Sequence, residues 1–186
     1  MTLSTLIQQL DTLGCSGFKT ALQRQSEDAN YTQLTFEERL YQLLEAEQSE
    51  RTNKKIKRLL SQAKFKDRQA SLEAIEYGSK RGIERSQILS LASGEYITKG
   101  QNILITGATG VGKSFLAQAL AKQAIFEGYS AKYYRVTRLL EEIKLARLEG
   151  SYTKTIQKLS RINLLILDVP QGHFLRALRS HSSQSR

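Results

Sequence analysis

The sequence predicts an α/β fold, a parallel sheet with helices on both faces, preceded by an all-helical N-terminal region. Three observations lead to this prediction. The 186 residues contain one proline, which favours long helices because proline disrupts helix interiors. Apolar residues recur at helical spacing through roughly the first hundred residues. After Gly94, short apolar runs alternate with amphipathic segments, as in a sheet whose parallel strands are connected by helices.

The N-terminus is predicted to begin with two helices. The first covers residues 2–13, where one helical face carries Leu3, Leu6, Ile7, Leu10 and Leu13. Glycines interrupt the pattern, and a second helix is expected from Phe18 to about Gln25. The polar segment Ser26–Gln33 is then expected to form a loop.

A long helix is predicted to follow. Thr35, with Glu38 three residues later, has the form of a capping box that opens this helix. Its buried side is expected to carry Phe36, Leu40, Leu43 and Leu44, and the helical pattern continues with Ile56, Leu59, Leu60 and Ala63. Two further short helices are expected near Leu72–Tyr77 and Glu84–Leu91.

The C-terminal half alternates between predicted strands and helices. Strands are expected at Asn102–Thr106, Ala131–Val136 and Asn163–Asp168, and helices at Lys113–Glu127, from a cap at Thr137 and from Ser151. The first strand is a continuous apolar run, which is typical of a strand buried on both faces. The helix after it is expected to bury Leu116, Leu120, Ala124 and Ile125.

Residues 107–114 carry the clearest chemical signal in the chain. They are Gly107, Ala108, Thr109, Gly110, Val111, Gly112, Lys113 and Ser114, which satisfy G-x-x-x-x-G-K-[ST] in full. Glycines let the backbone turn its N–H groups toward phosphate oxygens, and the helix that follows adds its positive dipole end. Lys113 is expected to reach the β- and γ-phosphates, and Ser114 to ligate Mg²⁺. Because the loop joins an apolar strand to an amphipathic helix, it predicts a site for ATP or a close nucleoside triphosphate.

A predicted metal ligand ends the third strand. The run Leu164-Leu-Ile-Leu-Asp168 places an aspartate where ligands bind in open α/β sheets, at the carboxyl end of a buried strand. We expect Asp168 to hold the magnesium ion with Ser114, and Lys113 and Asp168 to be the catalytic residues. The alternative, an aspartate that only caps a turn, is disfavoured by the phosphate loop about fifty residues earlier.

The charge distribution suggests a second kind of ligand. The formal net charge is +10, and the segment 51–68 concentrates basic residues after an acidic segment, 27–50. Its basic residues, the candidate nucleic-acid contacts, are Arg51, Lys54, Lys55, Lys57, Arg58, Lys64, Lys66 and Arg68. Such a stretch can contact a phosphate backbone, or it can be a solvated helix face that balances the acidic segment. Both interpretations stay open, and the net charge favours nucleic acid.

The sequence predicts a cytoplasmic protein. Its one cysteine, Cys15, excludes an internal disulfide and fits a reducing compartment. The N-terminus lacks the basic leader and long apolar core of a signal peptide. The longest apolar run, around Leu164–Leu167, is too short to span a membrane.

The chain resembles the IstB family, the AAA+-type helper ATPases of insertion-sequence transposition, which are related to the DnaC helicase loaders. The resemblance covers roughly residues 1–168 and is carried by Phe36-Glu-Glu-Arg-Leu40, Leu91-Ala-Ser93, Asn102–Ser114, Leu139-Leu-Glu-Glu142 and Leu164–Asp168. Many ATPases share the phosphate loop, so the N-terminal organisation and its spacing to the loop single out this family. The resemblance implies a P-loop NTPase fold, ATP with Mg²⁺ as cofactors, DNA binding with little sequence preference, assembly into a homo-oligomer and recruitment of a transposase.

The chain departs from the family pattern after Asp168. In the family a second acid follows, and it polarises the attacking water; here Val169 stands in its place. Valine cannot accept a proton, and general-base help is typically worth ~10²–10⁴ in rate, so weak hydrolysis is expected. Residues 171–186 match nothing in the family, which suggests a truncated or frameshifted product. The alternative is a functional basic extension in which Phe174, Leu175 and Leu178 form a short helix on the sheet.

The resemblance also implies an incomplete sheet. AAA+ sheets have the strand order 5-1-4-3-2, and candidates for strands 1 to 3 are the ones present. The first strand would then lose both neighbours, unless it pairs with the third strand or a partner or the tail fills the gap. Reduced stability is expected if the gap stays open, because a buried unpaired backbone group costs roughly 1–3 kcal/mol.

Three functions remain in competition. The first is an ATP-dependent helper of DNA transposition that acts with the transposase of its own element. The second is a non-catalytic remnant that binds nucleotide and DNA, and the third is a DnaC-like loader of a replicative helicase. The expected organisation is a helical DNA- or partner-contact region at 1–92, a partial P-loop ATPase core at 93–170 and an atypical basic tail at 171–186.

Overall fold

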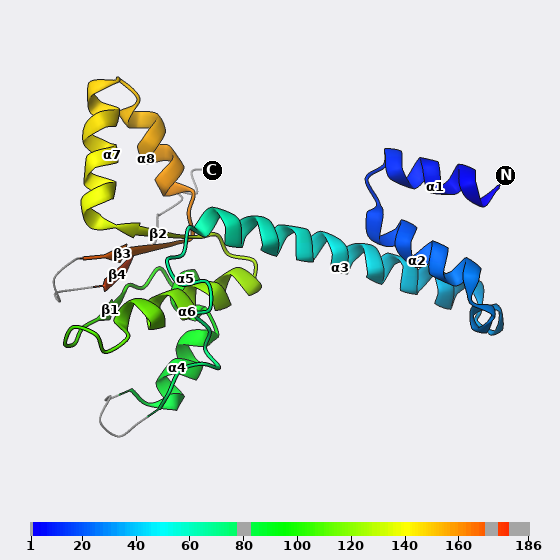
Figure 1. Ribbon diagram of the computed structural model, residues 1–186, viewed down its shortest axis with the longest axis horizontal. Coiled ribbons are helices and arrows are strands. Elements are labelled where there is room, and N and C mark those ends of the chain that lie inside the picture. Colours follow the sequence, from blue (N-terminus) through cyan, green and yellow to red (C-terminus); the bar gives the residue numbers. More distant parts are fainter. Residues whose placement is uncertain (1, 78–82, 170–174, 179–186) are drawn as a thin grey trace. The chain divides into compact units, whose positions relative to one another are not determined.

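The computed structural model describes residues 2–77 and 83–169, together with the backbone of 175–178 (Figure 1). The chain divides into two compact units, Met1–Lys57 and Arg58–Arg186. The functional division expected near residue 92 stays a prediction. Among the helices of the described ranges, none has the length and apolar character to cross a membrane.

The first unit is helical, as predicted. It contains α1 (Leu3–Thr12), α2 (Ser16–Glu27), the 3₁₀ helix η1 (Ala29–Gln33) and most of α3 (Phe36–Ala63). The predicted loop after α2 is thus partly a 3₁₀ turn. The capping box is present: the amide of Thr35 donates to Glu38 Oε2 at 2.8 Å, and the amide of Glu38 donates to Thr35 Oγ1 at 3.3 Å.

The packing of α2 on α3 depends on a glycine and a buried acid. A Cβ atom on Gly17 would lie 2.4 Å from the carbonyl oxygen of Ala46, so only glycine allows this approach. Oε2 of Glu47 accepts hydrogen bonds from the amides of Gly17 and Phe18, at 2.9 and 3.1 Å, and so caps the first turn of α2. The ion pair with Arg51, at 2.6 Å, is the main cause that lowers the pKa of Glu47.

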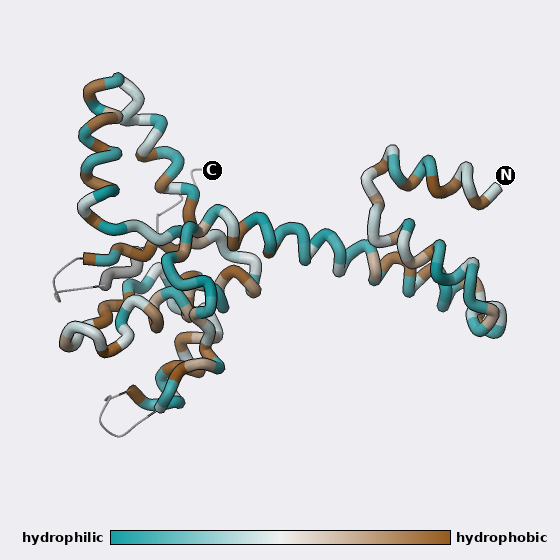
Figure 2. Tube along the Cα trace, in the orientation of Figure 1, coloured by the Kyte–Doolittle hydropathy of each residue, from teal (hydrophilic) through white to brown (hydrophobic). Residues whose placement is uncertain are grey.

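The buried stripe of α3 differs from the predicted one. Leu43 is 6% exposed, but Phe36 and Leu44 are 72% and 56% exposed, so the expectation that they are buried is wrong. The reason is geometric: α2 meets α3 through Ala46 and Glu47, and Leu44 lies about 100° further around the helix than Leu43. The middle of α3 is hydrophilic (Figure 2).

The segment between α3 and the sheet is less helical than predicted. Residues 72–77 form a turn, in which the Ile75 amide donates to the Leu72 carbonyl at 3.2 Å, and not a helix. The Ser71 hydroxyl accepts from the amide of Ala74 at 3.3 Å, an interaction that competes with helix formation. The predicted helix near 84–91 is present as α4 (Arg85–Ala92), while the four-residue α5 (Glu95–Thr98) was not expected.

The second unit is built on a four-stranded sheet. Its strands are β1 (Ile103–Ile105), β2 (Ala131–Arg135), β3 (Leu164–Asp168) and β4 (Leu175–Leu178), in the order β1-β4-β3-β2. β2 and β3 are parallel, and β4 is antiparallel to both β1 and β3. The three predicted strands therefore run in one direction, and residues 175–178 occupy the gap beside β1. The predicted helix at this point is wrong for 175–178, and Phe174 lies outside the described residues.

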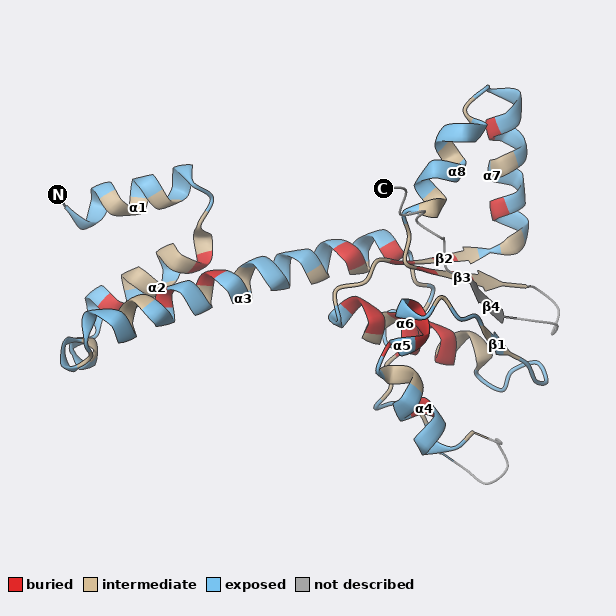
Figure 3. Ribbon diagram, turned by 180° about the vertical axis from the view of Figure 1, so that it is seen from behind, coloured by how far each residue is buried: buried red, intermediate tan, exposed pale blue. Residues whose placement is uncertain are grey.

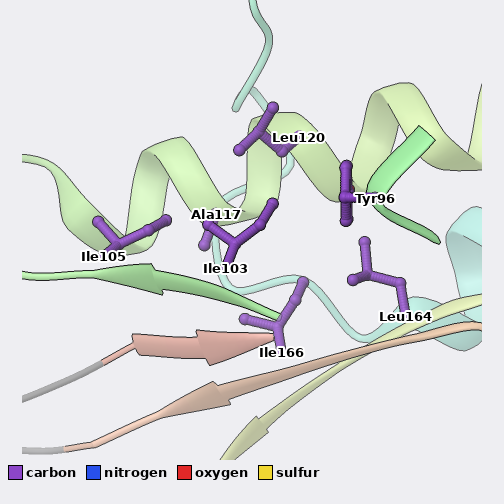
Figure 4. A pocket seen from close by; sticks show the side chains of 7 residues that line it. All are labelled: Tyr96, Ile103, Ile105, Ala117, Leu120, Leu164 and Ile166. Atoms are coloured by element: carbon purple, nitrogen blue, oxygen red, sulfur yellow. The ribbon is translucent and has the colours of Figure 1, made fainter. Parts of the chain in front are cut away.

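Helices cover both faces of the sheet, as predicted. α6 (Lys113–Phe126) lies on one face, and α7 (Val136–Leu148) with α8 (Tyr152–Ser160) lies on the other (Figure 1). α6 is the most buried helix of the unit (Figure 3). Its side chains Ala117 and Leu120 meet Leu164 and Ile166 of β3 in an apolar core, where they line a cavity of about 10 Å³ (Figure 4). Such a small apolar cavity stays dry.

Two local predictions for this unit are wrong. Leu104, in the middle of β1, is 59% exposed, so β1 is not buried on both faces. β1 ends the strand order, whereas α7 contacts β2 at the opposite end. Thr137 does not cap α7, because the strand β2 passes directly into the helix and Arg135 occupies the cap position.

Candidate nucleotide site

The phosphate loop connects β1 to the N-terminus of α6, as the sequence predicted. Gly110 and Gly112 have φ angles of 83° and 91°, in the left-handed region that glycine adopts without strain. Gly112 occupies the cap position of α6, with no side chain capping that end. The positive end of a fourteen-residue helix dipole therefore faces the loop.

Lys113 is held over the loop. Its Nζ donates to the carbonyl oxygens of Gly107 and Ala108, at 2.8 and 2.6 Å. The side chain also lines the cleft described below. An ammonium group in this place can exchange these carbonyl contacts for phosphate oxygens, which as anions bind it more strongly.

The predicted metal ligands lie next to each other. The hydroxyl of Ser114, in the first turn of α6, donates to Oδ2 of Asp168, the last residue of β3, at 3.3 Å. Mg²⁺ prefers oxygen ligands and is usually held by one or two carboxylates together with water and substrate phosphates. A hydroxyl and a carboxylate beside a phosphate loop fit that preference. The described residues contain no group of three or more His, Cys, Asp and Glu residues that could hold a metal without a substrate.

Two further residues at this site come from β2, and neither was predicted from the sequence. The hydroxyl of Tyr133 donates a hydrogen bond to Oδ2 of Asp168, and Arg135 lines the cleft. Burial, and then the contact with Asp168, raise the pKa of Tyr133, while Arg135 acts in the opposite direction. The hydroxyl therefore keeps its proton and acts as a donor. The sequence signal for Arg135 was its place near the carboxyl end of a predicted parallel strand, the edge at which Asp168 was expected. The structure pairs Arg135 with Asp168 in the sheet register.

The site is an open cleft with a volume of about 540 Å³. It is lined by Lys66, Thr109, Gly110, Gly112, Lys113, Ser114, Phe115, Arg135, Asp168 and Val169. Val169 lies at the position where a second acid was expected to polarise water. Lys66 belongs to the basic set predicted to contact nucleic acid, and it lines this cleft.

A buried glutamine connects the cleft to the segment that follows α3. Gln118 is 1% exposed, and its Nε2 donates to the carbonyl oxygen of Ser114 at 2.8 Å. Its Oε1 accepts from the amide of Asp67 at 2.9 Å. The backbone next to Lys66 is thereby bonded to the same helical turn that carries Ser114.

The predicted basic residues on α3 differ in their contacts. Arg51 pairs with Glu47, and Lys54 contacts Ser16 Oγ at 2.5 Å and Glu50 at 3.5 Å. The remaining residues of the predicted set on α3, Lys55, Lys57 and Arg58, are exposed.

Lys64 and Arg68 instead line a groove of about 390 Å³ in the second unit. Its other lining residues are Leu60, Ser61, Phe65 and Lys122. We call it the basic groove. Lys122, on α6, was absent from the predicted set; its Nζ donates to the carbonyl oxygen of Arg68 at 3.3 Å. The groove therefore has three cationic side chains and no acidic one in its lining.

A phosphate loop between a strand and a helix, with an acid from a second strand beside its serine, defines a P-loop nucleotide-binding domain. Comparison with known proteins identifies the family. The chain belongs to the IstB-like ATP-binding proteins, whose family model matches residues 8–174. The expectation that the family pattern is absent from residue 171 onward is therefore wrong for residues 171–174.

The relatives of the chain are named as insertion-sequence proteins. The chain is 42% identical over 168 residues to the ATP-binding protein of insertion sequence IS1162 from Pseudomonas fluorescens, an alignment that covers 90% of this chain and 72% of the relative. It is 37% identical to the insertion-sequence ATP-binding protein y4pL from Sinorhizobium fredii, in an alignment that covers 87% of this chain and 66% of the relative. It is 29% identical to the IS21 ATP-binding protein from Pseudomonas aeruginosa, in an alignment that covers 76% of this chain and 53% of the relative. The chain thus spans between about half and three quarters of these relatives.

Proposed function

We propose that this protein binds ATP with Mg²⁺ and acts as a helper protein in the transposition of an insertion sequence. The observation that carries the proposal is the junction of the phosphate loop with the Ser114–Asp168 pair, 3.3 Å apart, in one open cleft. The names of the related proteins support the biological setting.

The polar groups around the phosphate loop have the following proposed roles. The amides of the loop and the N-terminus of α6 bind the β- and γ-phosphates, and Lys113 supplies a positive charge to the same oxygens. Ser114 and Asp168 hold the magnesium ion, which neutralises charge on the phosphates when it is bound. Arg135, at the cleft wall, adds a further cation to this environment.

Nucleotide affinity of the purified chain tests this proposal. Hydrogen bonds to charged groups contribute about 1.5–3 kcal/mol, so Lys113→Ala should weaken ATP binding roughly 10- to 150-fold. Lys154→Ala, on the exposed side of α8, is the matched control and should bind as the wild type does. Equal affinities of the wild type and Lys113→Ala would refute the assignment.

Hydrolysis is proposed to be weak. Val169 follows Asp168 and lines the cleft, where it offers no proton acceptor to an attacking water. This favours a helper protein that binds nucleotide with little turnover. Val169→Glu should raise the ATPase rate if a missing base is the limitation. Rapid ATP hydrolysis by the wild type, or an unchanged ATPase rate in Val169→Glu, would contradict this proposal.

We further propose that the basic groove contacts the backbone of DNA, with little dependence on sequence. Lys64, Arg68 and Lys122 provide cations at the groove, and Phe65 provides an aromatic surface beside them. Lys122→Ala should weaken binding to all DNA sequences alike. It should also reduce the slope of log Kd against the logarithm of the salt concentration by about one. Lys144→Ala, an exposed lysine on α7, is the control. An unchanged salt dependence in Lys122→Ala would argue against the groove.

The partner is proposed to be the transposase of the same element. The relatives described above are named as insertion-sequence proteins, which favours transposition over helicase loading. Homo-oligomer formation on DNA is part of the same proposal. Co-purification with the transposase, measured beside the replicative helicase, separates the two partners.

A further inference from the structure

The hydroxyl of Tyr133 is a part of the site that the phosphate-loop motif does not explain. Tyr133 lies in the middle of β2, is 7% exposed and has Ile166 of β3 as its register partner. Its hydroxyl donates to Oδ2 of Asp168, the same oxygen that accepts from Ser114. Two hydroxyl groups from two different elements therefore converge on one carboxylate oxygen.

We propose that Tyr133 is a positioning residue that holds the Asp168 carboxylate for the magnesium ion, an inference that rests on the proposed nucleotide function. When Mg²⁺ is bound, the hydroxyl of Ser114 is expected to contact the metal. Its hydrogen bond is then no longer devoted to the Asp168 carboxylate. Tyr133 keeps the carboxylate oriented, because its side chain is buried and belongs to a strand that α6 contacts. Metal-binding carboxylates are usually held in this way, and loss of such a partner typically lowers metal affinity 10–100-fold.

The neighbouring Tyr134 provides a matched control. Side chains alternate along a strand, so Tyr134 points to the opposite face of the sheet from Tyr133. There the ammonium of Lys132 lies 5.4 Å from the centre of its ring. Tyr134→Phe therefore removes the same atom from the same strand on the face away from Asp168.

The experiment measures ATP affinity of the full chain as a function of Mg²⁺ concentration, beginning in EDTA. Tyr133→Phe should raise the Mg²⁺ concentration for half-maximal tightening roughly tenfold or more. Its affinity for ATP without metal should stay within about twofold of the wild type, because the phosphate contacts are made by other residues. Tyr134→Phe should match the wild type in both measurements.

A double-mutant cycle shows whether Tyr133 acts through Asp168. In an Asp168→Asn background, Tyr133→Phe should cause no further change in the Mg²⁺ requirement. An additional effect there, an unchanged requirement in the single variant, or an equal loss of metal-free affinity would each overturn the inference alone. Absence of Mg²⁺-dependent ATP binding in the wild type would overturn the proposed function and this inference together.

Discussion

Replacement of Gln118 by leucine tests how the nucleotide cleft is supported. Leucine has a similar volume and keeps the buried position filled, but it removes both polar atoms of the side chain. The carbonyl of Ser114 still accepts the backbone hydrogen bond of the helix, so losing the Gln118 Nε2 donor there costs little stability. The amide of Asp67 loses its acceptor in a partly buried position.

The expected loss follows from these contacts. A buried donor without a partner costs about 1–3 kcal/mol, and the partly buried amide of Asp67 bears a cost within that range. Burial of leucine in place of glutamine, at a position that is 1% exposed, offsets part of this cost. Gln118→Leu should therefore lower the free energy of unfolding by about 1 kcal/mol. At about 2–4 °C per kcal/mol for chains of this size, the melting temperature falls by several degrees.

Urea denaturation measures this effect, with Gln123→Leu as the control on the same helix. The Gln123 side chain contacts Glu127 at 3.3 Å at the surface, so its replacement should change stability by less than about 0.5 kcal/mol. A Gln118→Leu protein within that margin would refute the view that this glutamine secures the segment at Asp67. Equal losses in both variants would refute it as well, because the effect would then belong to the substitution and not to the contact.

Three further predictions concern other parts of the fold. Gly17→Ala places a methyl group 2.4 Å from a backbone oxygen of α3 and should destabilise the N-terminal unit by about 1–3 kcal/mol in thermal unfolding. The contact with Arg51 lowers the pKa of Glu47 from 4.5, so the charged carboxylate should stabilise this unit above pH 4.5 and lose that effect as the pH falls further; Glu47→Gln should flatten this part of the stability–pH profile. Ala177→Pro removes a backbone donor from a central strand and should speed hydrogen exchange in β1 and β3, whereas Arg176→Ala should not.

The sequence was sufficient for the elements whose patterns are long or chemically specific. α3 and α6 follow from many turns of apolar spacing, and the capping box at Thr35 marks the start of α3 within one residue. The phosphate loop is recognisable because its glycines and lysine are required together. Each of these signals lies within a continuous stretch of chain, so no knowledge of distant contacts was needed.

β4 could not be predicted for the opposite reason. Its four residues are too few to separate a strand period of two from a helical period of 3.6. What makes this segment a strand is the pairing with β1 on one side and β3 on the other, which are far away in sequence. The structure closes the gap in the sheet with an antiparallel strand, so the backbone groups of β1 gain a partner on that side and the expected penalty for leaving them unpaired does not apply there.

The basic segment was predicted as one set of nucleic-acid contacts, and its residues line two different openings of the second unit. α3 ends at Ala63, and Lys64 follows with a φ of 53°, which takes the chain out of the helix. Beyond this point Lys64 and Arg68 line the basic groove, whereas Lys66, between them, lines the nucleotide cleft. One short segment therefore forms a wall of both proposed sites, and the bond from its Asp67 amide to Gln118 secures it. Gln118→Leu removes the hydrogen bond that secures this segment and leaves every lining residue of both sites unchanged. Its effect on ligand binding therefore shows how far the two sites depend on the position of the segment, more directly than removal of any single lysine.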